Sequence, residues 1–225
     1  MPLLALQKLL QQSDLYREKN NQAQNKFIMN HLEIFPPGPL GLMAIKPRRK
    51  VFISYQHAPV DQIYRDEFEK MFARSNGVFI SKSVQLGDID PNLSVETIRA
   101  KIRDDYLRDS TVTVVLIGPN TWQRKHVDWE ISSSIRETAL SSRSGLLGIL
   151  LPHHPNFQHP TYDQGIVPPR LANNAACGFA SIYDWSTNAS SVSNWIEQAF
   201  NTREKVAPDN SYPHFVNNKF SDRWC

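Results

Sequence analysis

One acidic side chain, Glu130, occupies a position where a carboxylate could act on a ligand. Val127, Ile131 and Ile135 recur four residues apart, and this spacing predicts the buried stripe of a helix. At about 100° per residue, Glu130 falls on the shoulder of that stripe, in the first turns after an apolar strand. A carboxylate there can stabilise positive charge that develops on a ligand, most strongly where water is excluded. A surface glutamate without a chemical role is the alternative interpretation.

The elements around Glu130 follow from the spacing of apolar residues. Short β-branched runs predict strands, and amphipathic spacing predicts helices. The strands are expected at 50–55, 78–80, 111–117, 145–151 and 179–183, and the helices at 60–75, 94–108, 122–140 and 190–201. Val60 and Ile63 fall on the apolar face of the first of these helices, and Ser94 is the expected N-cap of the second.

The run at 111–117 is the most apolar in the chain, which is typical of a strand buried on both faces in a parallel sheet. Alternating strands and helices then predict an α/β fold: a doubly wound parallel sheet of about five strands with helices on both faces. Such sheets bind ligands outside the carboxyl ends of their strands, where the strand order reverses. We therefore expect the functional loops at 55–59, 82–93 and 118–125, with Thr121 a helix N-cap rather than a ligand contact.

Composition excludes several classes of protein. The chain has 225 residues, 40% of them hydrophobic, and a net charge of +3, so it can bury a core but does not itself indicate a nucleic-acid or membrane partner. The two cysteines, Cys177 and Cys225, have no C-x-x-C spacing, which disfavours a disulfide scaffold and a structural zinc site. No apolar run approaches the roughly 18 residues of a membrane span. The leucine-rich N-terminus lacks the features of a signal peptide, and we expect a cytoplasmic protein.

Two charged clusters have ordinary explanations. His153, His154, His159 and Asp163 lie in a Pro-rich segment, and their spacing does not suit a rigid metal site, so no metal is expected. The basic residues at 46–50 precede the first strand, where a solvated strand entry is the simpler interpretation and nucleic-acid binding is not expected.

Familiar nucleotide and hydrolase motifs are missing. The first strand is not followed by G-x-G-x-x-G, and the chain has no G-x-x-x-x-G-K-[ST], which argues against a Rossmann dinucleotide fold and a P-loop. It also has no G-x-S-x-G elbow, which argues against the usual α/β hydrolase.

The chain divides into three parts. Residues 1–44 combine a short amphipathic helix with a Pro-rich linker at 35–39, since no helix or strand interior accepts that run. They are expected to be either an upstream extension before Met43 or a helix that docks on the domain or on a second subunit. The main domain is expected at 45–205, followed by a C-terminal tail at 206–225.

Three segments together resemble the TIR-like family. The first, Val51-Phe52-Ile53-Ser54-Tyr55-Gln56-His57, is similar to the opening strand of TIR domains. The other two, at 113–121 and 124–131, run together and resemble the V-x-L-I-G-x-x-T-x-x-R-x-W-V-x-W-E-I pattern of the branch found in the Thoeris anti-phage defence system. The chain departs from that pattern at His126, where the family often has Trp; Trp122, Trp129 or His126 itself could supply the missing aromatic surface.

The resemblance implies a flavodoxin-like fold and an enzyme that cleaves the nicotinamide–ribose bond of NAD. NAD would be the substrate, Glu130 the catalytic carboxylate, and the product a cyclic or modified ADP-ribose that activates a separate effector. The resemblance also implies a homo-oligomer on activation, with the loop at 84–91 completing a neighbour's pocket. The candidate nucleotide contacts are polar or aromatic residues of the three loops and the following helix: Tyr55, Gln56, His57, Asp88, Asn120, Trp122 and His126.

Other interpretations stay open at this point. Gln56 and His57 could form turn-stabilising hydrogen bonds instead of touching a nucleotide, and Asp88 could be solvated. The fold could serve as a non-catalytic TIR–TIR assembly module in which Glu130 is inert, or as a nucleotide sensor or nucleoside-processing enzyme. The sequence does not decide whether water, an internal hydroxyl or another acceptor captures the sugar, nor what triggers the protein.

Overall fold

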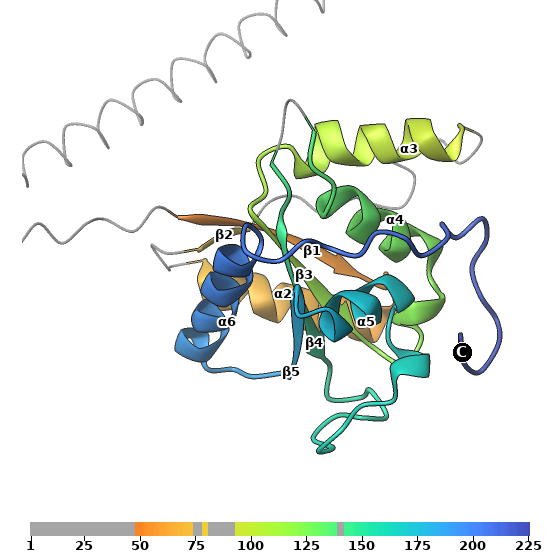
Figure 1. Ribbon diagram of the computed structural model, residues 1–225. Coiled ribbons are helices and arrows are strands. Elements are labelled where there is room, and N and C mark those ends of the chain that lie inside the picture. Colours follow the sequence, from red (N-terminus) through yellow and green to blue (C-terminus); the bar gives the residue numbers. More distant parts are fainter. Residues whose placement is uncertain (1–47, 74–77, 81–92, 139–141) are drawn as a thin grey trace, which may run out of the picture. The chain divides into compact units, whose positions relative to one another are not determined.

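The computed structural model describes residues 48–73, 78–80, 93–138 and 142–225 (Figure 1). The predicted N-terminal extension, 1–44, and the loop that carries Asp88 lie outside these ranges. Within the described part, none of the helices has the length and apolar character needed to cross a bilayer.

Five parallel strands form one sheet in the order β2-β1-β3-β4-β5. Their bounds are Arg49–Tyr55 (β1), Val78–Ile80 (β2), Val112–Ile117 (β3), Gly145–Leu150 (β4) and Ala180–Asp184 (β5). This confirms the predicted doubly wound parallel sheet, and the strand order is the flavodoxin-like one. Because the chain runs outward from β1 to β2 and then returns across β1 to β3, the strand order reverses between β1 and β3.

Helices cover both faces of the sheet (Figure 1). Helices α2 (Pro59–Phe72) and α6 (Ala189–Thr202) pack on one face. Helices α3 (Val95–Lys101), α4 (Lys125–Ser134) and α5 (Pro169–Ala176) pack on the other. A π-helix, η1 (Ile102–Leu107), continues α3, and short 3-10 turns form η2 (Thr121–Gln123) and η3 (Gln164–Ile166). Ser94 caps α3 as predicted, since its Oγ accepts a hydrogen bond from the backbone N–H of Thr97 at 3.2 Å.

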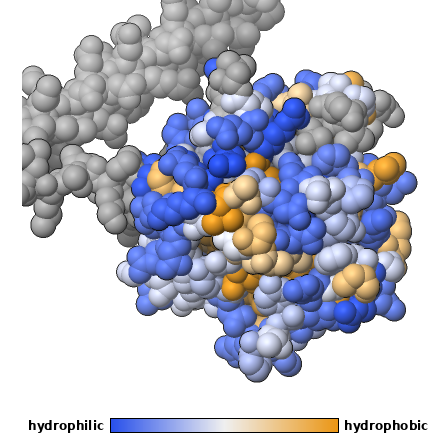
Figure 2. All heavy atoms as spheres, viewed as in Figure 1, coloured by the Kyte–Doolittle hydropathy of each residue, from blue (hydrophilic) through white to orange (hydrophobic). Residues whose placement is uncertain are grey.

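The middle strand β3 is buried along its whole length, as its apolar sequence predicts. Along β1, Val51, Ile53 and Tyr55 face α2 and α6, whereas Phe52 packs on the α3 and α4 side. The same alternation turns Ser54 toward α4. Figure 2 shows hydrophilic residues over most of the face drawn, with apolar ones gathered near its centre.

Two predicted helices differ in their details. The helix expected at 122–140 begins at Lys125, after η2, and ends at Ser134. In α2 the apolar stripe is narrower than predicted, because Val60 and Ile63 are 47% and 56% exposed. These two residues lie in the first turns of the helix.

Helix α5 was not predicted, because two adjacent prolines, Pro168 and Pro169, usually interrupt regular secondary structure. Pro169 instead occupies the first helical position, where the missing N–H has no intrahelical partner to lose. The helix buries Leu171 and Ala172 against the sheet.

The segment predicted as a C-terminal tail packs on α4 and α5. Phe215 is 2% exposed, its N–H donates to Asp128 Oδ2 at 3.1 Å, and its carbonyl accepts from Trp129 Nε1 at 2.9 Å. Arg170 of α5 donates to Asp128 Oδ1 at 3.0 Å and to the Tyr212 carbonyl at 2.7 Å. The C-terminal segment and α5 together therefore hold α4 against the sheet.

Candidate active site

Glu130 lies in the second turn of α4, and only 2% of it is exposed. Ser54 Oγ of β1 donates a hydrogen bond to Glu130 Oε2 at 2.5 Å. Burial raises the pKa of Glu130 to about 8, and the hydrogen bond from Ser54 opposes this rise. Within the described residues no cation acts on the carboxyl. The carboxyl thus lies inside the protein, beside the buried stripe formed by Val127, Ile131 and Ile135, and not in solvent.

A short connection brings α4 to the carboxyl end of β3. Thr121 Oγ1 accepts a hydrogen bond from the Gly118 N–H at 2.9 Å and lies 3.5 Å from the Leu116 carbonyl, so Thr121 stabilises the turn that leaves the strand. The prediction that Thr121 caps the helix is wrong: the N-cap of α4 is Arg124, which makes no side-chain capping bond. Because η2 lies between β3 and α4, the sixth residue of α4, Glu130, lies against Ser54 near the end of β1.

Three aromatic rings cross the carboxyl end of β1. The Tyr55 and His57 rings lie 4.6 Å apart, and the His57 and His126 rings lie 5.1 Å apart, between centroids. His126 Nε2 is 3.1 Å from the Tyr55 carbonyl. Because a carbonyl only accepts, Nε2 carries the hydrogen and Nδ1 is bare. Burial lowers the pKa of His126 to about 4, so the ring is neutral at pH 7.

The predicted contacts do not all gather at this place. Tyr55, His57 and His126 form the row of rings, and Gln56 is half-buried beside them. Asn120 is exposed in the neighbouring loop, whereas Trp122 is 2% exposed and lies in the protein interior. Asp88 lies outside the described residues.

Two residues at this end of the sheet were not recognised from the sequence. Ser54 was placed at the end of a strand but was not paired with Glu130, because the sequence does not show which helix faces β1. Asp61, 2% exposed, accepts a hydrogen bond from His153 Nε2 at 2.7 Å. An acidic residue in the first turn of a helix is common near the positive end of the helix dipole, so nothing in the sequence singles it out.

The histidines considered as metal ligands have separate partners. His153 binds Asp61, His154 Nε2 lies 3.3 Å from the Ile166 carbonyl, and Asp163 accepts from Arg223. Over the described ranges, no three His, Cys, Asp or Glu side chains are grouped so that they could hold a metal ion.

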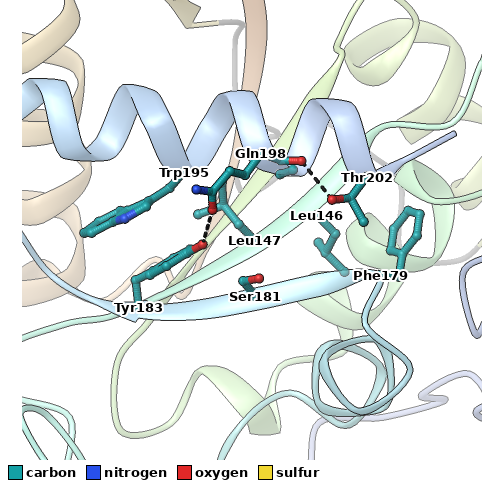
Figure 3. Close-up of a pocket in the computed structure, with 9 residues that line it drawn as sticks. Leu146, Leu147, Phe179, Ser181, Tyr183, Trp195, Gln198 and Thr202 are labelled. Carbon is teal, nitrogen blue, oxygen red and sulfur yellow. Dashed lines mark hydrogen bonds between the residues drawn. The ribbon is translucent and has the colours of Figure 1, made fainter. Parts of the chain in front are cut away.

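A pocket of about 280 Å³ lies elsewhere, between α6 and the edge strand β5 (Figure 3). The Tyr183 and Trp195 rings stack at 4.4 Å, and Tyr183 donates a hydrogen bond to Gln198 at 2.8 Å (Figure 3). Its other lining residues are apolar or hydroxylated, and none is acidic or basic. The pocket therefore has no group suited to acid–base or electrostatic catalysis, and the row of rings near Glu130 is the better candidate site.

One family of known proteins matches part of the chain. Residues 52–156 match the family described as Thoeris protein ThsB, TIR-like domain. The matched segment runs from β1 to just beyond β4 and includes Ser54, His126 and Glu130. No curated protein matches the chain. Residues 52–156 of this chain are therefore similar to the TIR-like domain of the Thoeris ThsB family.

Proposed function

We propose that this protein cleaves the bond between nicotinamide and ribose in NAD, with Glu130 as the catalytic carboxylate. The observation that carries the proposal is the buried carboxyl of Glu130, which has one hydrogen bond and no counter-charge among the described residues. Burying such a group costs stability, and strongly perturbed carboxyls concentrate at functional sites. Its place beside the point where strand order reverses supports the same reading.

The reaction makes modest demands on the protein. The nicotinamide ring of NAD is already cationic, so it leaves as a neutral molecule without a general acid. Positive charge then develops on the ribose, and a carboxylate in a water-poor site stabilises it strongly. A cation close to Glu130 also favours ionisation of the carboxyl. The raised pKa of Glu130 therefore falls when the cationic substrate binds.

The neutral state of His126 fits a cationic substrate. A protonated imidazole near Glu130 would repel the pyridinium ring, whereas a neutral ring offers an aromatic face. Burial keeps the pKa of His126 at about 4, and burial together with the charge of Arg65 lowers the pKa of His57. The His126 position thus supplies an uncharged aromatic ring where the family often has Trp.

The family match supports a proposal about the wider role. We propose that the product is a cyclic or otherwise modified ADP-ribose, made in the cytoplasm during anti-phage defence, and that it activates a separate effector. Gln56 and Asn120 remain proposed nucleotide contacts, whereas Trp122, which lies in the protein interior, is no longer proposed as one. Asp88 is proposed to act from the loop at 84–91, in a homo-oligomer that forms on activation.

A non-catalytic assembly module is the second candidate. The observation that favours it is the pair of exposed apolar side chains Val60 and Ile63 in the first turns of α2. Adjacent apolar residues on a helix surface can pack against a second copy. In that case replacing Glu130 would leave partner binding and signalling unchanged.

The test is to incubate concentrated protein with NAD and identify every product by chromatography and mass. The proposal expects nicotinamide in equal amount to one ADP-ribose product, whose mass separates hydrolysis from cyclisation by one water. If NAD is not consumed even in the assembled protein, or in lysate of infected cells, the assembly module is the function that stands.

A further inference from the structure

A second polar cluster lies at the same end of the sheet, around Asp61 and His153. Asp61 comes from the first turn of α2 and is 2% exposed. His153 follows β4, and its Nε2 lies 2.7 Å from Asp61 Oδ1. The pair therefore connects a helix on one face of the sheet with the loop that leaves a central strand.

The carboxyl of Asp61 packs against the backbone of Gly118, the residue at which the chain leaves β3. A Cβ added at Gly118 would lie 2.6 Å from Asp61 Oδ1 and 2.7 Å from Oδ2. Only glycine leaves room for the carboxyl at this position. Asp61 thus occupies the turn beside the point where the strand order reverses, which is where ligands bind in sheets of this type.

Three buried polar atoms in this cluster have no hydrogen-bond partner among the described residues: Asp61 Oδ2, His153 Nδ1 and Arg124 Nε. Arg124 is the N-cap of α4 and is half-buried. Burial raises the pKa of Asp61, and the positive charge of Arg124 opposes this rise. Burial lowers the pKa of His126, and the charge of Arg124 lowers it further. Buried polar atoms in native proteins are almost always bonded. Three together point to a partner that comes from outside the chain.

Aromatic rings close one side of the cluster. The Tyr64 ring stacks on His153 at 5.6 Å with an interplanar angle of 16°, and Trp185 meets Tyr64 edge-on at 5.2 Å. The His153 side chain is 29% exposed, so His153 and the half-buried Arg124 are the parts of the cluster that reach the surface.

We propose that Asp61, His153 and Arg124 form a subsite for a ribose phosphate. A guanidinium donates to phosphate oxygens, while a carboxylate oxygen and a bare imidazole nitrogen accept from sugar hydroxyls. The unpartnered atoms of the cluster supply this combination. The assignment of the ligand rests on the proposed function: the subsite takes the adenosine-side ribose phosphate of NAD, while Glu130 acts on the nicotinamide side. Arg124, close to both Asp61 and His126, joins the two halves.

The test is calorimetric binding of AMP, which contains the ribose phosphate but not the bond that is cleaved. Wild-type protein is expected to bind AMP more tightly than adenosine. Asp61→Asn and Arg124→Gln are each expected to weaken AMP binding at least tenfold, and Arg124→Gln to remove the advantage of AMP over adenosine. Arg124 is only half-buried, so this variant keeps the test decisive if Asp61→Asn fails to fold. The matched control is Asp109→Asn, since the Asp109 side chain is 78% exposed, and it is expected to bind as wild type.

Glu130→Gln separates this proposal from the proposed function. AMP binding is expected to survive in Glu130→Gln, because the variant leaves the ribose-phosphate subsite intact. If AMP binding depends on Asp61 and Arg124 while NAD is never consumed, the subsite stands and the NAD-cleaving function falls. If NAD is consumed but AMP binds equally to wild type, Asp61→Asn and Arg124→Gln, or to none of them, the subsite is overturned.

Discussion

The hydroxyl of Ser54 donates a hydrogen bond to the carboxyl of Glu130 across 2.5 Å and thereby joins β1 to α4. Among the described residues, Ser54 is the only hydrogen-bond partner of the Glu130 carboxyl, and the bond opposes the effect of burial on the pKa of that carboxyl. The bond fixes the direction of the carboxyl and favours its ionised form. Through this contact the sheet lowers the pKa of the proposed catalytic carboxyl.

Ser54→Ala is expected to slow NAD cleavage at pH 7 and to restore much of the rate at higher pH. Loss of the hydrogen bond raises the pKa of Glu130 further, so less of it is ionised at pH 7. One hydrogen bond to a charged group contributes about 1.5 kcal/mol or more, which corresponds to at least a tenfold slower reaction. The measurement is a pH–rate profile, and Ser181→Ala, an exposed serine on β5, is the matched control. A uniform loss at every pH would contradict a role for Ser54 in setting the ionisation of Glu130.

The raised pKa of Glu130 makes stability depend on pH. The unfolded chain releases this proton near the ordinary pKa of 4.5, whereas the folded protein holds it to about pH 8. Between these values the folded state binds more protons, so stability falls as pH rises, by up to roughly 1.4 kcal/mol per pH unit. Glu130→Gln, which does not titrate, is expected to gain thermal stability relative to wild type from pH 5 to pH 8.5. Parallel curves for the two proteins would show that Glu130 titrates normally.

Arg170→Gln is expected to destabilise the protein and also to disturb the candidate active site. It leaves Asp128 buried without its cation, and breaking a buried ion pair costs about 3–5 kcal/mol. Asp128 lies two residues before Glu130 on α4 and also binds the Phe215 N–H, so the loss displaces the helix. Urea unfolding measures the effect. Replacing Arg65 by Gln is the control, because its partially exposed pairs with Asp66 and Glu69 are expected to contribute less than about 1 kcal/mol.

Gly118→Ala is expected to lower the free energy of unfolding by about 1–3 kcal/mol, the usual cost of overpacking. The new methyl group would meet the Asp61 carboxyl at 2.6 Å. Adding Asp61→Ala removes that obstacle, and the double variant should cost less than the sum of the two single variants. Strict additivity in thermal or urea unfolding would mean that the two residues do not touch.

The sheet could be predicted from the sequence because its strands are short, β-branched and separated by turn residues. The strand 111–117 is the clearest example, since a nearly continuous run of Val, Leu and Ile, interrupted only by Thr111 and Thr113, is typical of burial on both faces. Glu130 could also be found, because its spacing from Val127 and Ile131 fixes its side of the helix. The family pattern at 113–131 supported both.

The rest of the site depends on contacts between residues far apart in sequence. Helix spacing shows that Glu130 flanks the apolar stripe, but it does not show that Ser54 of β1 binds the carboxyl or that Phe215 of the C-terminal segment binds the neighbouring Trp129. The partners of Asp61 and Arg170 lie in other elements, and no local pattern marks them. The start of α4 was misplaced because the residues that form η2, Thr121–Gln123, also fit the first turn of an α-helix.

The most direct test of the account compares nicotinamide release by wild type, Glu130→Gln and Glu137→Gln at a protein concentration that supports assembly. Glu137 is exposed just beyond α4, so its variant makes the same chemical change outside the site. Wild type and Glu137→Gln are expected to release nicotinamide at equal rates. The rate of Glu130→Gln is expected to fall at least tenfold, which corresponds to roughly 1.4 kcal/mol of barrier or more. Equal release by all three proteins, or none by the wild type, would contradict catalysis by Glu130.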